Sequence, residues 1–67
     1  MNYLVFELRS DKKVLSKFLE NAKFSEAEPY FDDFKKYSVM AFGGKPADLD
    51  LKLGDELPLG YDPGDEM

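Results

Sequence analysis

The sequence contains no cysteine and no histidine. Without cysteine the chain has no disulfide and no thiolate that could bind zinc or attack a substrate. Without histidine it lacks the commonest general base and the commonest transition-metal ligand. The 67 residues have room for one domain, and a domain this small buries only about 60% of the surface that its unfolded chain exposes. We therefore expect the chain to fold on its apolar core alone or with a partner, and without a cofactor.

Long hydrophobic runs are also missing. No apolar run approaches the roughly 18 residues that a transmembrane helix needs. The first residues are apolar over too short a stretch for a signal peptide, and they lack a basic segment and a small-residue cleavage site. The absence of cysteine agrees with a reducing compartment. We expect a soluble cytoplasmic protein that contacts no membrane, located in the host cytoplasm if the chain is viral.

Positive charge is scarce in the second half of the chain. The net charge is −5, yet residues 1–37 are neutral because they hold seven Lys or Arg and seven Asp or Glu. Residues 38–67 hold two Lys against seven Asp or Glu, and no cation follows Lys52. Nucleic-acid binding requires Lys or Arg to neutralise phosphates, so we expect no direct nucleic-acid contact. The distribution favours a protein partner with a basic surface; the alternative is that the acidity serves only solubility.

Two patterns at the start of the chain predict a strand followed by the main helix. Apolar residues alternate with mixed positions over residues 2–9, which predicts a strand with Leu4, Phe6 and Leu8 on one face. Ser10 and Asp11 are both good helix caps. Beyond them, apolar residues recur at i, i+1, i+4, i+5 and i+8, a spacing that predicts a helix over residues 11–23. Its apolar stripe is expected to pack on the Leu4 face, and comprises Val14, Leu15, Phe18, Leu19 and Ala22.

Residues 24–37 allow more than one interpretation. Pro29 suits the first turn of a short helix, and Tyr30, Phe34 and Tyr37 would then share one helical face. Four aromatic residues within eight positions also favour a strand, and a loop is a third alternative. We favour a helical turn.

The remaining segments predict further strands. Residues 37–42 form a second strand that Gly43 and Gly44 end, and residues 48–53 show the cleanest alternation in the chain, with Leu49, Leu51 and Leu53 facing the core. Residues 57–61 continue the alternation, and Pro58 would confine that strand to an edge.

The predicted fold class is therefore α+β. A small mixed or antiparallel sheet of three or four strands is packed by one main helix. Residues 1–61 form a single domain, and residues 62–67 form a flexible acidic tail.

No motif in the sequence carries catalytic chemistry. The run from Gly43 to Lys45 is followed by proline and lacks the earlier glycine of a phosphate-binding loop. Counted from Asp48, a calcium loop would need a ligand where Lys52 stands and glycine where Leu53 stands. No serine has a histidine to activate it. We expect a protein that is not an enzyme and that holds no metal.

The features of the sequence that suit binding to a partner are its many aromatic residues and its excess of acidic residues. Tyrosine combines apolar area with a hydroxyl group and is enriched at interfaces. Core packing is the alternative for the aromatic candidates, and a solvated surface is the alternative for the acids. The candidate partner-binding residues are Tyr30, Phe31, Tyr37, Asp48, Asp50, Asp55, Glu56, Tyr61 and Asp62.

In size and charge the chain resembles the small acidic proteins that phages and mobile elements use against host machinery. The resemblance implies a non-catalytic inhibitor or modulator. Its carboxylates would stand where phosphates lie in a basic groove of a nucleic-acid-acting host protein, for example a defence nuclease complex. One alternative is an immunity protein or antitoxin that neutralises a toxin. Another is a small structural or assembly subunit that binds its partner through the edge of its sheet. Formation of a homo-oligomer is a further alternative.

Overall fold

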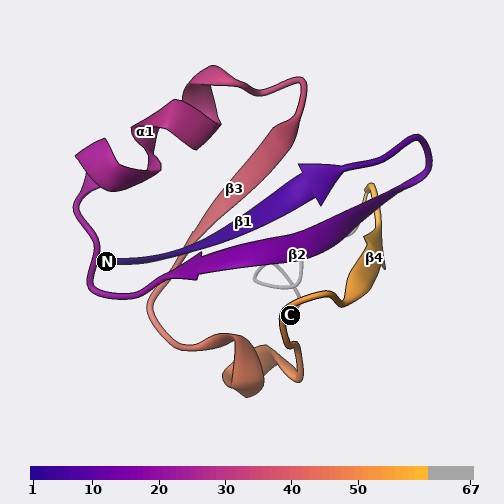
Figure 1. The fold of residues 1–67 in the computed structure, drawn as a ribbon. Coiled ribbons are helices and arrows are strands. Elements are labelled where there is room, and N and C mark those ends of the chain that lie inside the picture. Colours follow the sequence, from indigo (N-terminus) through magenta and orange to yellow (C-terminus); the bar gives the residue numbers. More distant parts are fainter. Residues whose placement is uncertain (61–67) are drawn as a thin grey trace.

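The computed structural model describes residues 1–60, and these form a four-stranded antiparallel sheet with one α-helix. The strand order is β3-β1-β2-β4 (Figure 1). The predicted α+β class is confirmed. Tyr61 and the predicted tail of residues 62–67 lie outside the described residues. In chain order the elements are β1 (Asn2–Leu8), β2 (Lys12–Leu19), α1 (Phe24–Asp32), β3 (Tyr37–Phe42), the 3-10 helix η1 (Pro46–Leu49) and β4 (Glu56–Pro58).

The central strand β1 is covered on both faces. On one face, which we call the α1 face, Tyr3 forms a buried cluster with Ala27 of α1. On the other, which we call the η1 face, Leu4 and Phe6 form a cluster against which Leu49 of η1 packs. Because neither face meets water, the run of residues 3–6 is buried throughout. Two small apolar clusters on either side of one sheet therefore replace a single large core.

The predicted main helix over residues 11–23 is wrong. Most of that segment is β2, which pairs antiparallel with β1 across a short turn. Leu15 and Phe18 do reach the Leu4 and Phe6 cluster as predicted, but they do so from a neighbouring strand. Ala22, predicted to join them, lies in the cluster on the α1 face instead.

A β-bulge explains why this strand has a helical spacing of apolar residues. Leu15 and Lys17 face consecutive residues of β1, so Ser16 is an extra residue in β2. The extra residue reverses the alternation of side chains. Leu15 and Phe18 consequently share the η1 face although they lie three positions apart, while Leu19 packs on the α1 face. A strand with a bulge thus shows the same apolar spacing as one turn of helix.

The ambiguous segment forms α1, so the favoured helical interpretation is confirmed. The Glu26 carboxylate accepts a hydrogen bond from the Lys23 backbone N–H at 2.9 Å, which satisfies one donor at the start of the helix. Pro29 lies inside the helix rather than in its first turn. Its ring has no N–H to donate to the Ser25 carbonyl group one turn earlier, which weakens the helix at that point.

The C-terminal half of the chain agrees in part with the elements predicted from the sequence. β3 spans the predicted residues 37–42, and β4 contains Pro58 at the sheet edge as expected. The predicted strand over residues 48–53 is wrong, because Pro46 begins η1 and Asp50 adopts the left-handed conformation with φ of 61°. Pro46 suits the first position of a helix, and the turn at Asp50 ends the alternation.

Two of the three leucines predicted to face the core in this segment do so. Leu49 and Leu51 pack against the cluster on the η1 face, whereas Leu53 is 61% exposed. Within residues 1–60, none of the helices is both long and apolar enough to span a membrane.

Candidate protein-binding surfaces

An exposed group of phenylalanines lies on and just after α1, and we call it the α1 aromatic surface. It comprises Phe24, Phe31 and Phe34, which are 57%, 37% and 71% exposed. The rings of Phe24 and Phe31 are stacked, with their centroids 5.3 Å apart. Phe31 also meets the edge of the Tyr3 ring at 6.3 Å, which connects the surface to the buried cluster. Exposed aromatic side chains fixed in this way are typical of protein-binding sites.

The two tyrosines proposed beside Phe31 have a different environment. Tyr30 and Tyr37 are half-buried and pack edge to face, with their ring centroids 5.1 Å apart. The ammonium group of Lys17 lies 5.7 Å from the Tyr30 ring, and that of Lys36 lies 5.5 Å from the Tyr37 ring. These contacts connect α1 to the sheet, so each tyrosine has a structural role and offers only part of its ring to a partner.

Phe24 and Phe34 were missed by the sequence interpretation although they are the most exposed members of the surface. Once residues 24–32 are taken as a helix, Phe24 and Phe31 stand seven positions apart and so lie on the same helical face. That spacing is the signal that could have identified them. Phe34 follows the helix and Tyr37 begins β3, so the single helical face predicted for Tyr30, Phe34 and Tyr37 does not form.

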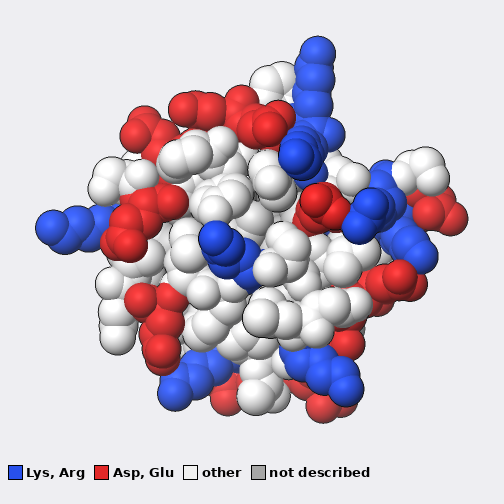
Figure 2. Space-filling view, in the orientation of Figure 1, with Lys and Arg blue, Asp and Glu red and all other residues white. Residues whose placement is uncertain are grey.

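α1 itself carries only negative charge, from Glu26, Glu28 and Asp32. Asp32 ends the helix, Asp33 caps it, and no basic residue lies in its last turn. Carboxylates at this end meet the negative pole of the helix dipole, which lowers helix stability. Figure 2 shows acidic side chains along the upper and left edges of this view, over the position of α1, with uncharged side chains and a basic one toward the centre.

The second candidate surface consists of the carboxylates from η1 to the start of β4, and we call it the acidic segment. Its members are Asp48, Asp50, Asp55 and Glu56. The Asp48 carboxylate accepts a hydrogen bond from the Lys45 N–H, and the Asp55 carboxylate accepts one from the Lys52 N–H, each at 3.0 Å. Both bonds span three residues and close local turns. Glu56 forms an ion pair with Lys12 at 2.9 Å in which both side chains stay exposed. These predicted acidic residues therefore stabilise local turns and also give the surface its negative charge.

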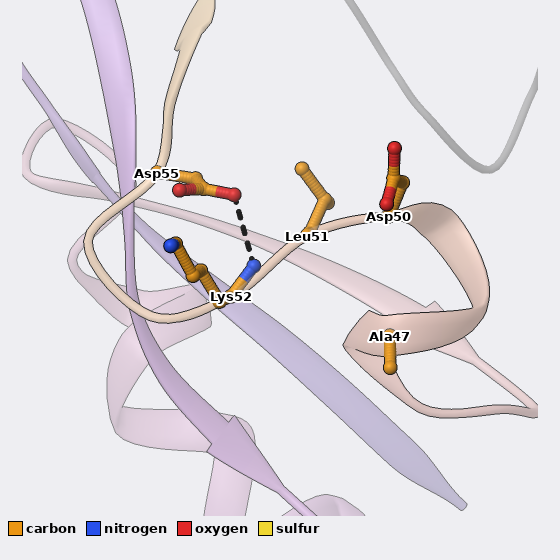
Figure 3. A pocket seen from close by; sticks show the side chains of 5 residues that line it. All are labelled: Ala47, Asp50, Leu51, Lys52 and Asp55. Atoms are coloured by element: carbon orange, nitrogen blue, oxygen red, sulfur yellow. Dashed lines mark hydrogen bonds between the residues drawn. The ribbon is translucent and has the colours of Figure 1, made fainter.

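An open groove of about 340 Å³ lies in the acidic segment. Figure 3 shows Asp50 and Asp55 on either side of Leu51, with Lys52 beside Asp55. Two carboxylates and one ammonium group thus share one groove, which suits an extended partner segment with basic side chains better than an anion. Among residues 1–60, no group of three or more acidic side chains is arranged to hold a metal ion.

The two candidate surfaces lie on opposite sides of the sheet. Phe31 contacts Tyr3 on the α1 face, whereas Leu49 and Leu51, which flank Asp50, pack on the η1 face. The structure therefore separates the aromatic candidates from the acidic ones. Tyr61 and Asp62 lie outside the described residues.

Comparisons of the chain with protein-family models, with curated proteins and with solved structures find no match. Proposals about function therefore rest on the surfaces described above.

Proposed function

We propose that the protein is a non-catalytic inhibitor or modulator that inserts into a basic groove of a nucleic-acid-acting protein. The observation that carries the proposal is the stacked and exposed pair of Phe24 and Phe31 on a helix whose charged residues are all acidic. Aromatic anchors bordered by carboxylates match an apolar pocket bordered by Lys and Arg. Basic side chains are also what such proteins use to hold phosphates.

The separation of the two surfaces favours a groove over a flat contact. A flat partner could cover either the α1 aromatic surface or the acidic segment, because these lie on opposite faces of the sheet. The walls of a groove could contact both at once. In that arrangement the phenylalanines provide apolar contact on one wall, and Asp48, Asp50 and Glu56 meet basic side chains on the other.

The local structure of the acidic segment supports a role in binding. Asp48 and Asp55 are each fixed by a backbone N–H through one carboxylate oxygen. Each has a second oxygen that makes no hydrogen bond or ion pair within residues 1–60. A carboxylate whose position is already fixed loses less conformational entropy when it binds a partner.

The test begins with affinity capture from lysate of the cells that express the protein, followed by identification of the captured protein and its purification. Three baits are compared: the wild type, Phe24→Ser/Phe31→Ser, and Leu59→Ser as a control that changes an apolar residue outside both surfaces, 44% exposed in the structure. The purified partner is then mixed with duplex DNA or structured RNA.

We expect the double variant alone to lose the partner, and nucleic acid to compete with the wild type for it. A partner that binds no nucleic acid, or that binds the wild type and the double variant equally, would contradict the proposal.

A further inference from the structure

The two edges of the sheet differ in how they are protected. The edge strand β4 has three residues, includes Pro58, and is bordered by the ion pair of Lys12 with Glu56. Short length, proline and charge are devices that prevent an edge from pairing with another chain. The opposite edge strand, β3, has six residues with the sequence YSVMAF, which contains no charge, proline or glycine. It lacks all of these devices.

The hydrogen-bonding pattern shows which groups of β3 face outward. The Leu8 N–H donates to the Lys36 carbonyl group at 2.8 Å, so even-numbered residues of this segment direct their backbone groups toward β1. Tyr37, Val39 and Ala41 therefore direct theirs away from the sheet. The Tyr37 N–H already donates to the Asp33 carbonyl group at 2.9 Å. Within residues 1–60, the outward N–H groups of Val39 and Ala41 have no acceptor.

We propose that β3 pairs antiparallel with β3 of a second copy of the chain, so that two sheets join into one continuous sheet. The twofold axis passes by Met40, and Val39 lies opposite Ala41 of the second copy. In this register the outward N–H and C=O groups of both residues satisfy one another. The alternative register, with Val39 opposite Val39, places each Ala41 carbonyl group opposite a Tyr37 N–H that is already engaged.

The side chains of β3 fit a second copy as well. Met40 and Phe42 are only partly buried and lie on the η1 face against the cluster of Leu4 and Phe6. In the proposed register Met40 meets Met40 of the second copy, which extends this cluster across the axis. Pairing brings no like charges together, because residues 37–42 are uncharged. A domain this small, without a disulfide, gains apolar burial from such an interface.

A cysteine at position 40 tests the register directly, because the natural sequence has no cysteine. Met40 would face its copy as a non-hydrogen-bonded pair with Cα atoms about 4.5 Å apart, within the range that a disulfide spans. Ser38→Cys is the matched control, since Ser38 lies on the same face but would be four residues, roughly 13 Å, from its copy. On mild oxidation we expect Met40→Cys to form a covalent dimer and Ser38→Cys to stay monomeric. Equal cross-linking of both, or of neither, would overturn the proposal.

A second variant separates pairing from folding. Ala41 is exposed and its N–H faces outward, so Ala41→Pro removes a donor to the second copy without breaking a bond to β1. We expect its circular dichroism to match the wild type, and its dimer dissociation constant in sedimentation velocity to rise at least ~10-fold. Wild-type protein that sediments as a monomer at high concentration would refute the proposal. So would a folded Ala41→Pro variant that associates as tightly as the wild type.

Discussion

The side-chain nitrogen of Asn2 donates a hydrogen bond to the carbonyl oxygen of Gly44, 2.6 Å away. The side-chain oxygen of the same Asn2 accepts a bond from the Asn21 N–H at 2.8 Å. One buried amide therefore connects the start of β1 to the loops that follow β2 and β3. Asn21 holds a positive φ of 52°, a conformation that asparagine adopts more readily than most residues other than glycine.

We expect Asn2→Ala to lower the free energy of unfolding by about 1–3 kcal/mol, because it leaves part-buried backbone groups without partners. Urea denaturation followed by circular dichroism measures the loss. Glu28→Ala, an exposed change on α1, is the control and should leave stability within about 0.5 kcal/mol of the wild type. Equal stability of both variants would mean that the amide does not connect the loops.

A pair of matched leucines tests the placement of β2 and of the segment after η1. Leu15 is fully buried and Leu53 is 61% exposed. Leu15→Ala should cost about 2–5 kcal/mol through loss of burial and the cavity left behind. Leu53→Ala should change stability by no more than about 0.5 kcal/mol. A strand over residues 48–53 with Leu53 in the core would make the second variant costly too, and denaturation midpoints distinguish the outcomes.

Adjacent glycines provide a second matched pair. A Cβ atom at Gly44 would lie 2.5 Å from the Asp48 carboxylate and 3.0 Å from the Phe42 ring, whereas one at Gly43 would meet nothing within 4 Å. Gly44→Ala should therefore cost about 1–3 kcal/mol, since it disturbs the turn that Asp48 closes. Gly43→Ala should be neutral or stabilise slightly, because alanine restricts the unfolded chain. Thermal melting of both variants gives the order, and the reverse order would contradict the described turn.

Side-chain alternation predicts β1, but it also predicts a strand over residues 48–53, where the structure has η1 and a left-handed turn at Asp50. β1 and β3 pair in one unbroken register, so no bulge interrupts the segments that the sequence predicted as strands. β2 was misread because Ser16 inserts one residue into the strand, and its hydroxyl donates to the Val5 carbonyl group of β1 at 3.2 Å. No local rule separates a bulged strand from a helical turn when both place apolar residues at i, i+1, i+4 and i+5. Only the pairing with β1 decides between them.

The candidate surfaces were predicted less completely than the fold. Phe31 is exposed, but Tyr30 and Tyr37 pack against each other, and Lys17 of β2 lies over the Tyr30 ring. The acids were recognised from charge alone, which cannot show that Asp48 and Asp55 close turns. Their separation from the phenylalanines follows from which face of the sheet each segment covers, and local sequence does not contain that information.

The ion pair of Lys12 with Glu56 should contribute little to stability. Both side chains are largely exposed, at 41% and 56%, and exposed pairs are worth about 0–1 kcal/mol. Glu56→Gln should therefore leave the denaturation midpoint almost unchanged. If this variant unfolds at a much lower urea concentration, the pair fixes β4 in place and the acidic segment is chiefly structural.

The central claim is that the acidic segment guides binding to a basic partner and the α1 aromatic surface holds the complex. The most direct test is the rate at which the identified partner associates with the protein in stopped flow. The wild type is compared with a variant that carries Asp48→Asn, Asp50→Asn, Asp55→Asn and Glu56→Gln. Asparagine keeps an oxygen that can close each turn, so the fold is retained. The measurement is repeated at two salt concentrations, because the Debye length falls from about 10 Å at 0.1 M to about 3 Å at 1 M. We expect the neutralised variant to associate several-fold more slowly at low salt and at the wild-type rate at high salt. Equal association rates at low salt would contradict the claim and leave the acids as solubility and turn-forming residues.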